Sequence, residues 1–285
     1  LVVLIAPSSR QNQVSAAGLA VPDNLREFYN ALRNGTAGGG DDDDDGPRRC
    51  RHELATGFYD TDNASGTTSY CADSAENPSI IWLASSKKKN QKGSSTATGS
   101  LTNMDIDCDG VQGGPQDDGR CSMGRSPDYQ DATAFRDVVR SYNVANVTDL
   151  NTYVHPYVVF GNSGSKRGWK TFDPEKHGVR PLSVMAVVCG GAGREKLVFG
   201  VWGDTNGDDG DKPVVGEASI SLATACNGRS MTGDYGYDEN DVLYLAFTGD
   251  EAVPGAKGAD WGASDYEAFH KSIEDLGNKL VAKVK

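Results

Sequence analysis

Six apolar segments of the chain have the residue types of buried β-strands. They are rich in Val, Ile, Tyr and Phe and are bounded by Gly, Pro or Asp, which is typical of strands in a packed core. We expect these strands at residues 80–84, 153–161, 182–188, 197–203, 214–222 and 242–247. Six strands around one core favour a barrel or a sandwich. We predict an α+β domain built on a six-stranded barrel, with the double-psi type as one candidate.

Three other segments repeat their apolar residues with helical spacing. The first helix is expected to start at Pro22-Asp23, and the second near Asp131. The last closes the chain, where Ser264 and Glu267 have the spacing of a capping box. The predicted apolar faces comprise Leu25, Phe28, Tyr29 and Leu32 in the first, Phe135, Val138, Val139 and Tyr142 in the second, and Tyr266, Phe269, Ile273, Leu276, Leu280 and Val284 in the last.

The polar and low-complexity stretches suggest where the folded domain begins. Residues 1–49 are interpreted as a signal-peptide remnant followed by a low-complexity segment, and residues 50–285 as one globular domain. The aspartate run at 41–45 is expected to be solvated rather than a calcium site. A Lys-rich stretch within 85–102 is predicted to be a surface loop away from any cleft.

The charge balance narrows the class of partner. The 285 residues contain 28 Lys and Arg against 40 Asp and Glu, a net charge of −12. Such a negative field repels nucleic acids and anionic membranes and suits a polycationic partner, although an excess of acid also serves solubility alone. No segment has the length of apolar chain that a bilayer requires, so we expect a protein outside the membrane. We also expect a monomer.

The cysteines and glycosylation motifs indicate an oxidising, secretory route. The six cysteines contain no CxxC pair of the zinc or redox type, so disulfides are expected. Cys108 and Cys121 close a short Gly-rich loop and are the one pair that we predict; the others stay open among the possible pairings. Sequons at Asn34, Asn63 and Asn146 agree with secretion.

Carboxylates are the side chains that offer chemistry here. The four histidines are scattered, and no HExxH or GxSxG motif is present, which argues against zinc and serine catalysis. Acidic residues gather instead in MDIDCDG at 104–110 and in GDTNGDDG at 203–210. Both segments resemble the start of a calcium-binding EF-hand loop, but neither has the acidic twelfth position. Calcium stays an alternative, and we expect neither metal nor cofactor.

A hairpin would bring two of these carboxylates together. If the predicted strands at 197–204 and 214–222 pair directly, Asp204 and Glu217 face one cleft. Directly opposite side chains would suit a retaining glycosidase, and diagonal ones an inverting enzyme with room for a water. Trp202 is expected to face the core. The spacing alone also fits a turn residue and a solvated strand residue.

Beyond these patterns, the chain resembles the fungal chitosanases of glycoside hydrolase family 75. The similarity runs in order from about residue 50 to the C-terminus. It includes MDIDCDG at 104–110, HPYVVFGN at 155–162, PLSVMAVVC at 181–189, VWGDTNG at 201–207, VGEASISLATAC at 215–226, GYDENDVLYLAF at 236–247 and AVPGA at 252–256.

The resemblance implies an inverting endo-hydrolase of chitosan, the cationic β-1,4 polymer of glucosamine, with Asp204 and Glu217 as its catalytic pair. Glu217 would then be the general acid and Asp204 the general base that activates water. Asp105, Asp107 and Asp109 are candidates to bind the ammonium groups of the substrate, with turn and cap roles as the alternative. Other readings are a hydrolase of a different β-1,4-glycan and a calcium-dependent carbohydrate-binding module without catalysis.

Overall fold

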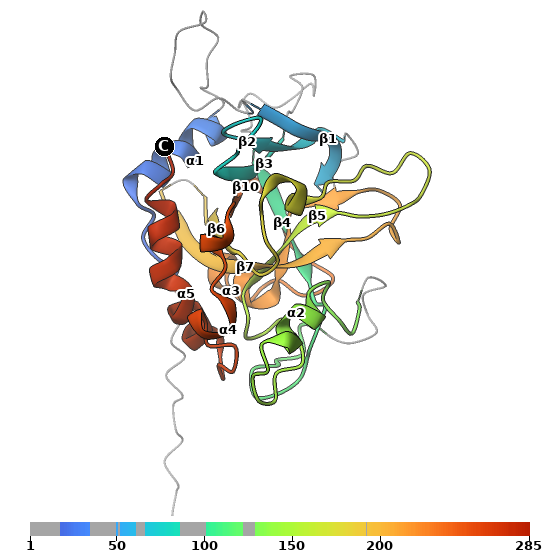
Figure 1. The fold of residues 1–285 in the computed structure, drawn as a ribbon, viewed down its shortest axis with the longest axis vertical. Coiled ribbons are helices and arrows are strands. Elements are labelled where there is room, and N and C mark those ends of the chain that lie inside the picture. Colours follow the sequence, from blue (N-terminus) through green and yellow to red (C-terminus); the bar gives the residue numbers. More distant parts are fainter. Residues whose placement is uncertain are drawn as a thin grey trace, which may run out of the picture.

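One hydrogen-bonded sheet forms the centre of the fold in the computed structural model, which describes residues 18–34, 50, 52–60, 66–85, 101–121, 129–191 and 193–285 (Figure 1). Within these residues the strands join in the order β4-β9-β5-β7-β6-β10-β3-β2-β1-β8. Their bounds are β1 His52–Asp60, β2 Thr68–Ala72, β3 Ile80–Ser85, β4 Thr102–Asp107, β5 Tyr157–Asn162, β6 Val184–Cys189, β7 Lys196–Asn206, β8 Val214–Val215, β9 Glu217–Ser219 and β10 Tyr237–Phe247.

Strand β4 pairs with both β9 and β10, so six strands follow one another around a ring. The ring is uneven. β9 has only three residues, and β10 meets β4 at two separated positions, Tyr237 opposite Met104 and Val242 opposite Thr102. The α+β class is confirmed, whereas the six-stranded barrel, and its double-psi type, stay predictions.

One strand prediction is wrong in its last third. The expected strand at 214–222 is divided into β8, β9 and the helix α3, Ile220–Asn227. Ser219 caps this helix by accepting the N–H of Leu222. The helix is apolar on nearly every side because it is buried in the core, so its sequence lacks the periodicity that distinguishes a helix from a strand. The strands β1, β2 and β4 were not predicted.

The three predicted helices are present, although the second begins at Arg136 and not near Asp131, with Phe135 as its N-cap residue. They are α1 Asp23–Asn34, α2 Arg136–Ser141 and α5 Tyr266–Val281, and α4 Gly255–Gly258 and the 3-10 turns η1 Pro174–His177 and η2 Asp250–Ala252 complete the set in the described residues. The cap of α5 differs from the prediction: Asp265, not Ser264, accepts the N–H of Ala268. The capping carboxylate also lies next to the positive end of the helix dipole.

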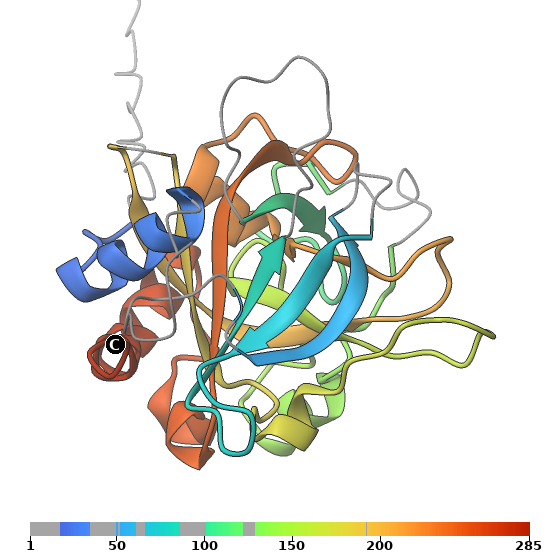
Figure 2. The same ribbon diagram turned by 90° about the horizontal axis from the view of Figure 1, so that it is seen from above.

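Helices α1 and α5 lie side by side against one side of the sheet (Figure 2). The apolar face of α1 is buried in the same core as α5. The side-chain amide of Asn24 donates to the carbonyls of Val281 and Val284, joining α1 to the C-terminal end. Helix α1 lies before the predicted domain boundary at residue 50, yet its apolar residues are part of the folded core.

Three disulfides join Cys50 to Cys71, Cys108 to Cys121, and Cys189 to Cys226. The predicted pair, Cys108 and Cys121, is confirmed. Cys108 follows β4 directly, so this disulfide ties the end of that strand to the loop that ends at Cys121. The end of β4 is thereby covalently restrained.

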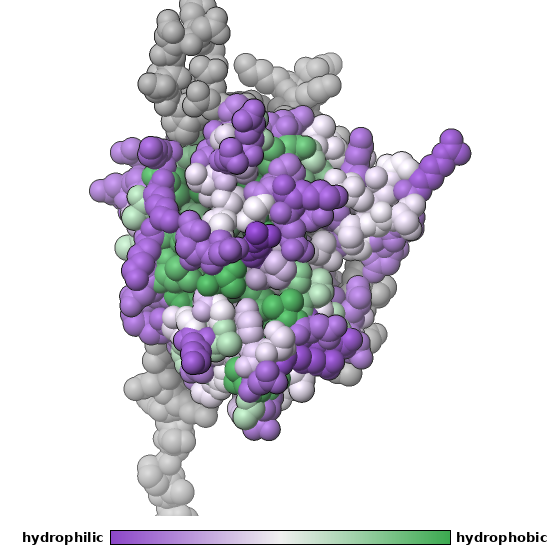
Figure 3. Space-filling model, viewed as in Figure 1, coloured by the Kyte–Doolittle hydropathy of each residue, from purple (hydrophilic) through white to green (hydrophobic). Residues whose placement is uncertain are grey.

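Other predictions concern the surface. Asn34 and Asn146 are exposed, and Asn63, the aspartate run at 41–45 and the lysines at 87–92 lie outside the described residues. Within the described residues, no helix combines the length and the apolar character of a membrane span. On the face shown in Figure 3, polar residues cover most of the surface and apolar residues gather in patches between them.

Candidate active site

A cleft of about 710 Å³ opens where β4, β9, β5 and β7 lie side by side. Its volume is in the range of ligand-binding pockets. Nine carboxylates and one amine, Lys212, are among its described lining side chains. The carboxylates belong to Asp105, Asp107, Asp109, Asp204, Asp209, Asp211, Glu217, Asp234 and Asp238. The strong excess of acid makes the cleft attractive to cations.

The predicted hairpin is wrong, but its consequence holds. Strands β7 and β9 do not pair with each other, because β5 lies between them. Val159 of β5 is paired with Asp204 on one side and with Glu217 on the other. Paired residues of adjacent strands point to the same face, so both carboxylates face the cleft.

A bulge in β7 orients Asp204. Trp202 is opposite Val158 and Asp204 is opposite Val159, so one extra residue, Gly203, is accommodated between them. A Cβ at Gly203 would lie 2.5 Å from the Cβ of Tyr157, which explains the glycine. The bulge places Trp202 and Asp204 on opposite faces, although regular alternation over two residues would place them on the same face. Trp202 is buried as predicted, and the bulge is the reason.

Gly216 sets the position of Glu217. It has a φ of 96° and its carbonyl accepts the N–H of Asp105. A Cβ there would lie 2.9 Å from Oδ1 of Asn103, so a larger residue would be strained in conformation and in space. Immediately after it, Glu217 pairs with Asp105 of the parallel strand β4. The two acidic side chains are therefore neighbours on one face of the sheet.

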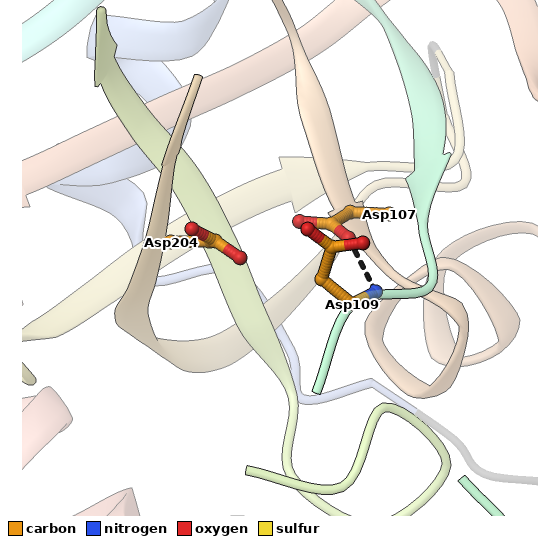
Figure 4. A group of neighbouring side chains, drawn as sticks. All are labelled: Asp107, Asp109 and Asp204. Carbon is orange, nitrogen blue, oxygen red and sulfur yellow. Dashed lines mark hydrogen bonds between the residues drawn. The ribbon is translucent and has the colours of Figure 1, made fainter. Parts of the chain in front are cut away.

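Asp107, Asp109 and Asp204 form a second group, which we call the aspartate cluster. Each contributes a carboxylate oxygen, and these oxygens all lie within 4.8 Å of one another. Asp107 and Asp109 reach toward Asp204 from the end of β4 (Figure 4). The N–H of Asp109 donates to Asp107 at 2.7 Å, and the N–H of Gln130 donates to Asp109 at 2.6 Å. The cluster is thus held in place by backbone donors.

Asp204 is the most enclosed member of the aspartate cluster. It is 5% exposed, and its Oδ1 accepts the N–H groups of Ala134 at 3.0 Å and Thr205 at 2.7 Å. Its Oδ2 is buried with no hydrogen-bond partner among the described residues. The loop that presents Ala134 is itself fixed, because Asp149 accepts both the N–H and the hydroxyl of Thr133. Asp204 therefore has a fixed orientation and one buried oxygen that accepts no hydrogen bond from the described residues.

Burial and mutual repulsion favour the protonated forms of these acids. Burial, followed by the charges of Asp107 and Asp109, raises the pKa of Asp204 well above its ordinary value. Burial raises the pKa of Asp107 to about 6, against the lowering effect of its hydrogen bonds with Asp109 and Tyr157. A cation that entered the cluster would offset the repulsion and favour ionisation of Asp204.

The aspartate cluster is also the group of described residues that could hold a metal ion. Carboxylate oxygens suit calcium or magnesium. The two EF-hand readings fail in the structure, however. Asp105 lies in a strand and outside the cluster, and Asp208 uses its carboxylate to accept the N–H groups of Ser165 and Lys166.

All five residues singled out from the sequence line this cleft: Asp105, Asp107, Asp109, Asp204 and Glu217. The sequence reasoning missed the contributions of Asp209, Asp211, Asp234, Asp238 and Tyr129. The first two belong to the acidic loop after β7, whose composition could have indicated them. The others come from segments that only the tertiary fold brings to the cleft.

Comparison with known proteins gives the same family as the motifs. Residues 104–283 match the model of the fungal chitosanases of glycosyl hydrolase group 75. The chain is 40% identical to an endo-chitosanase of Aspergillus oryzae over 95% of its own length and 94% of the relative. It is 39% identical to an endo-chitosanase of Aspergillus fumigatus with the same coverage.

A more distant relative, endo-chitosanase C of Aspergillus oryzae, is 29% identical over 64% of this chain and 39% of its own length. The family match covers most of β4, the cleft strands β5, β7 and β9, and the C-terminal helix α5. The chain therefore belongs to the fungal chitosanases of glycosyl hydrolase group 75, and it is a glycoside hydrolase.

Proposed function

We propose that this enzyme hydrolyses β-1,4 bonds within chitosan chains by an inverting mechanism, with Asp204 and Glu217 as its two catalytic carboxylates. The observation that carries the proposal is their placement on either side of Val159, facing one acidic cleft. The curated relatives are named endo-chitosanases. We further propose that the enzyme is secreted, as its three disulfides suggest, and acts as a monomer, because one chain supplies both carboxylates.

The charge of the cleft supports a polycationic substrate. The lining of the cleft contains nine carboxylates and one lysine. Chitosan carries an ammonium group on most of its sugar units at acidic pH, so several units could each meet a carboxylate. Asp105, Asp107 and Asp109 lie beside the catalytic pair and are proposed to bind the ammonium groups nearest the cleaved bond. A neutral β-glucan would leave these carboxylates uncompensated, which disfavours that alternative.

Strand geometry supports inversion. Neighbouring strands lie about 4.8 Å apart, so two residues on either side of a third strand have backbones about 10 Å apart. Inverting glycosidases separate their carboxyl groups by about 6.5–9.5 Å to admit a water, whereas retaining enzymes keep them about 5 Å apart. With β5 in between, Asp204 and Glu217 are proposed to hold the wider spacing.

The division of labour depends on protonation. As a general base, Asp204 must be ionised when it activates the water. In the free enzyme, burial beside Asp107 and Asp109 favours its protonated form. We propose that the substrate ammonium, bound by Asp107 and Asp109, offsets this repulsion and lets Asp204 ionise, while Glu217 donates its proton to the glycosidic oxygen. Productive binding and activation of the base would then be coupled.

The test is cleavage of highly deacetylated chitosan by the wild type and by the variants Asp204→Asn and Glu217→Gln, followed by viscosity and by release of reducing ends. We expect rapid thinning by the wild type and a loss of about a thousandfold or more in each variant, the scale of acid–base catalysis. The anomer first formed, read by NMR, should be the inverted one. An active Asp204→Asn variant would remove Asp204 from the mechanism.

A chelator separates this proposal from the calcium-dependent alternative. A hydrolase that needs no metal keeps its rate in EDTA, whereas a calcium-dependent binding module loses its affinity for the polysaccharide. Activity that disappears in EDTA and returns with calcium would assign the aspartate cluster to a metal instead.

A further inference from the structure

A second cavity of about 250 Å³, which we call the annex, adjoins the cleft. The two cavities share five lining residues, Cys108, Tyr129, Gly233, Asp234 and Tyr235. The remaining walls of the annex come from Gln112, Thr232 and the segment 118–121. A polymer lying in the cleft can therefore continue into the annex without leaving the protein surface.

One wall of the annex is a tight turn held in a fixed shape. Thr232 and Tyr235 exchange two backbone hydrogen bonds, each 3.0 Å long. Between them, the N–H of Gly233 donates to the carbonyl of Arg120. Arg120 is next to Cys121, which the disulfide to Cys108 joins to the end of β4. A wall that is already ordered binds a ligand at a lower entropic cost.

This turn presents Tyr235 to solvent. Its side chain is 73% exposed, and no other large hydrophobic residue is exposed to this degree in the part of the chain that the structure describes. An exposed aromatic ring at the rim of a binding cleft is a surface on which the apolar face of a sugar ring can pack. Tyr129 contributes a second, half-buried ring to the same cavity.

The charge of the annex differs from that of the cleft. Asp118, one of its two carboxylates, is paired with Arg120 at 2.8 Å and also with Arg229. These arginines satisfy Asp118, so it is a poor partner for a further cation. The side-chain amide of Gln112 donates to the carbonyl of Cys108, and the hydroxyl of Thr232 accepts the N–H of Asp234. The amide oxygen of Gln112 and the hydroxyl hydrogen of Thr232 are therefore the neutral groups that an amide of the ligand can hydrogen-bond. The annex is thus aromatic and nearly balanced in charge.

We propose that the annex is a sugar subsite for an uncharged unit, the N-acetylglucosamine that partly acetylated chitosan contains, with Tyr235 as its stacking platform. This inference rests on the proposed function. It makes Tyr235 a specificity-determining residue: the cleft selects ammonium-bearing units near the cleaved bond, and the annex accepts an acetylated unit farther along the chain. The position of acetylated units in the products would follow from this division.

The experiment compares Tyr235→Ala with Tyr235→Phe, which keeps the ring, on two chitosans of equal length, one highly deacetylated and one partly acetylated. Initial rates give kcat and KM, and mass spectrometry locates acetylated units in the products. We expect Tyr235→Ala to raise KM for the partly acetylated polymer about three- to tenfold with kcat unchanged, the factor that a stacked ring contributes. KM for the deacetylated polymer should rise less, because its charged units suit the annex poorly, and Tyr235→Phe should match the wild type.

Equal increases in KM on both polymers, or no increase on either, would overturn the proposal. It would also be overturned if Asp234→Asn raised KM chiefly for the deacetylated polymer, because the annex would then bind an ammonium. Asp234 is the annex carboxylate that forms no ion pair with an arginine among the described residues. Failure of the proposed function gives a different result: a wild type that cleaves neither polymer.

Discussion

The aspartate cluster and the two buried histidines are ionisable groups shielded from water, and they differ in their charge and in their hydrogen bonding. His155 is 4% exposed; its Nδ1 accepts the N–H of Asn151, and its Nε2 donates to the carbonyl of Trp261. The Nε2 of His270 accepts the N–H of Phe199. Burial lowers the pKa of both histidines to about 4, so they stay neutral at ordinary pH.

The contrast separates a structural role from a ligand-binding one. The histidines are uncharged and bonded to the backbone, whereas the aspartate cluster concentrates like charges and leaves Oδ2 of Asp204 without a partner among the described residues. Unsatisfied buried polar atoms cost stability, and native proteins keep few of them. We infer that the histidines stabilise the fold and that the cluster is maintained for its ligand.

Among the changes that compare the cluster with the histidines, replacing Asp107 by Asn should produce the largest effect. The variant keeps the shape of the side chain but removes a charge from the proposed ammonium site, so kcat/KM on chitosan should fall about tenfold to a hundredfold. Thermal stability at neutral pH should stay the same or rise, because repulsion with Asp204 is relieved. Asp275→Asn, an equal change of charge on the exposed face of α5, is the control and should alter neither quantity.

A variant Asp107→Asn that lost stability and kept full activity would contradict the ligand-binding role of the aspartate cluster. Asp107 would then be a structural residue like the histidines, and the site for the ammonium would have to be sought at Asp105 or in the loop after β7.

The pH dependence of stability should distinguish the two groups next. The unfolded chain protonates its histidines near pH 6.5, but folded His155 and His270 resist protonation down to about 4. Their contribution is therefore complete above about pH 6.5 and is lost as the pH falls through 4, by up to about 3 kcal/mol each. Asp107 acts in the opposite sense: its folded pKa of about 6 lies above its ordinary value of 3.8, so its contribution is complete at low pH and is lost as the pH rises to about 6.

Urea unfolding measured from about pH 4 to 7 checks these signs. The variant His155→Gln should be less stable at pH 7 and should lose less stability on acidification than the wild type. Asp107→Asn should instead make stability rise more steeply between about pH 4 and 6, because the variant lacks the contribution that falls with pH over that range. An acid slope that is unchanged in both His155→Gln and His270→Gln would show that other groups govern acid unfolding.

The smallest expected effect is that of salt. Raising ionic strength screens the attraction between the acidic cleft and a polycation, so KM for highly deacetylated chitosan should rise a few-fold while kcat changes little. The fold should tolerate the same salt, since the buried histidines are neutral. A KM that does not respond to salt would favour a neutral glycan as substrate.

The residues of the site were accessible from the sequence more readily than their arrangement. Asp204 and Glu217 were identified from motifs, and a hairpin was the simplest local way to join them. The insertion of β5 between their strands could not be predicted, because pairing between segments distant in the chain leaves no local signal. The Gly203 bulge is likewise a matter of tertiary contact with Tyr157.

Short-range features were predicted better. The Cys108–Cys121 disulfide, the start of α1 and several strands depend on neighbouring residues, and the structure agrees with them. Helix α3 was mistaken for a strand because burial on nearly all sides removes its polar face. Tyr235 was missed since an isolated tyrosine between Gly and Asp residues has no pattern; only its exposure beside a cavity distinguishes it.

The placement of Val159 between the two carboxylates has a consequence for how this enzyme can evolve. On the proposed mechanism, the distance between the two carboxylates that admits water is set mainly by the width of the intervening strand β5. Changing an acid to its longer or shorter homologue would adjust the gap only slightly, whereas a retaining enzyme would require a different strand order. Loops such as the Tyr235 turn lie outside this constraint, so preference for a substrate can drift while the stereochemistry of the product stays fixed.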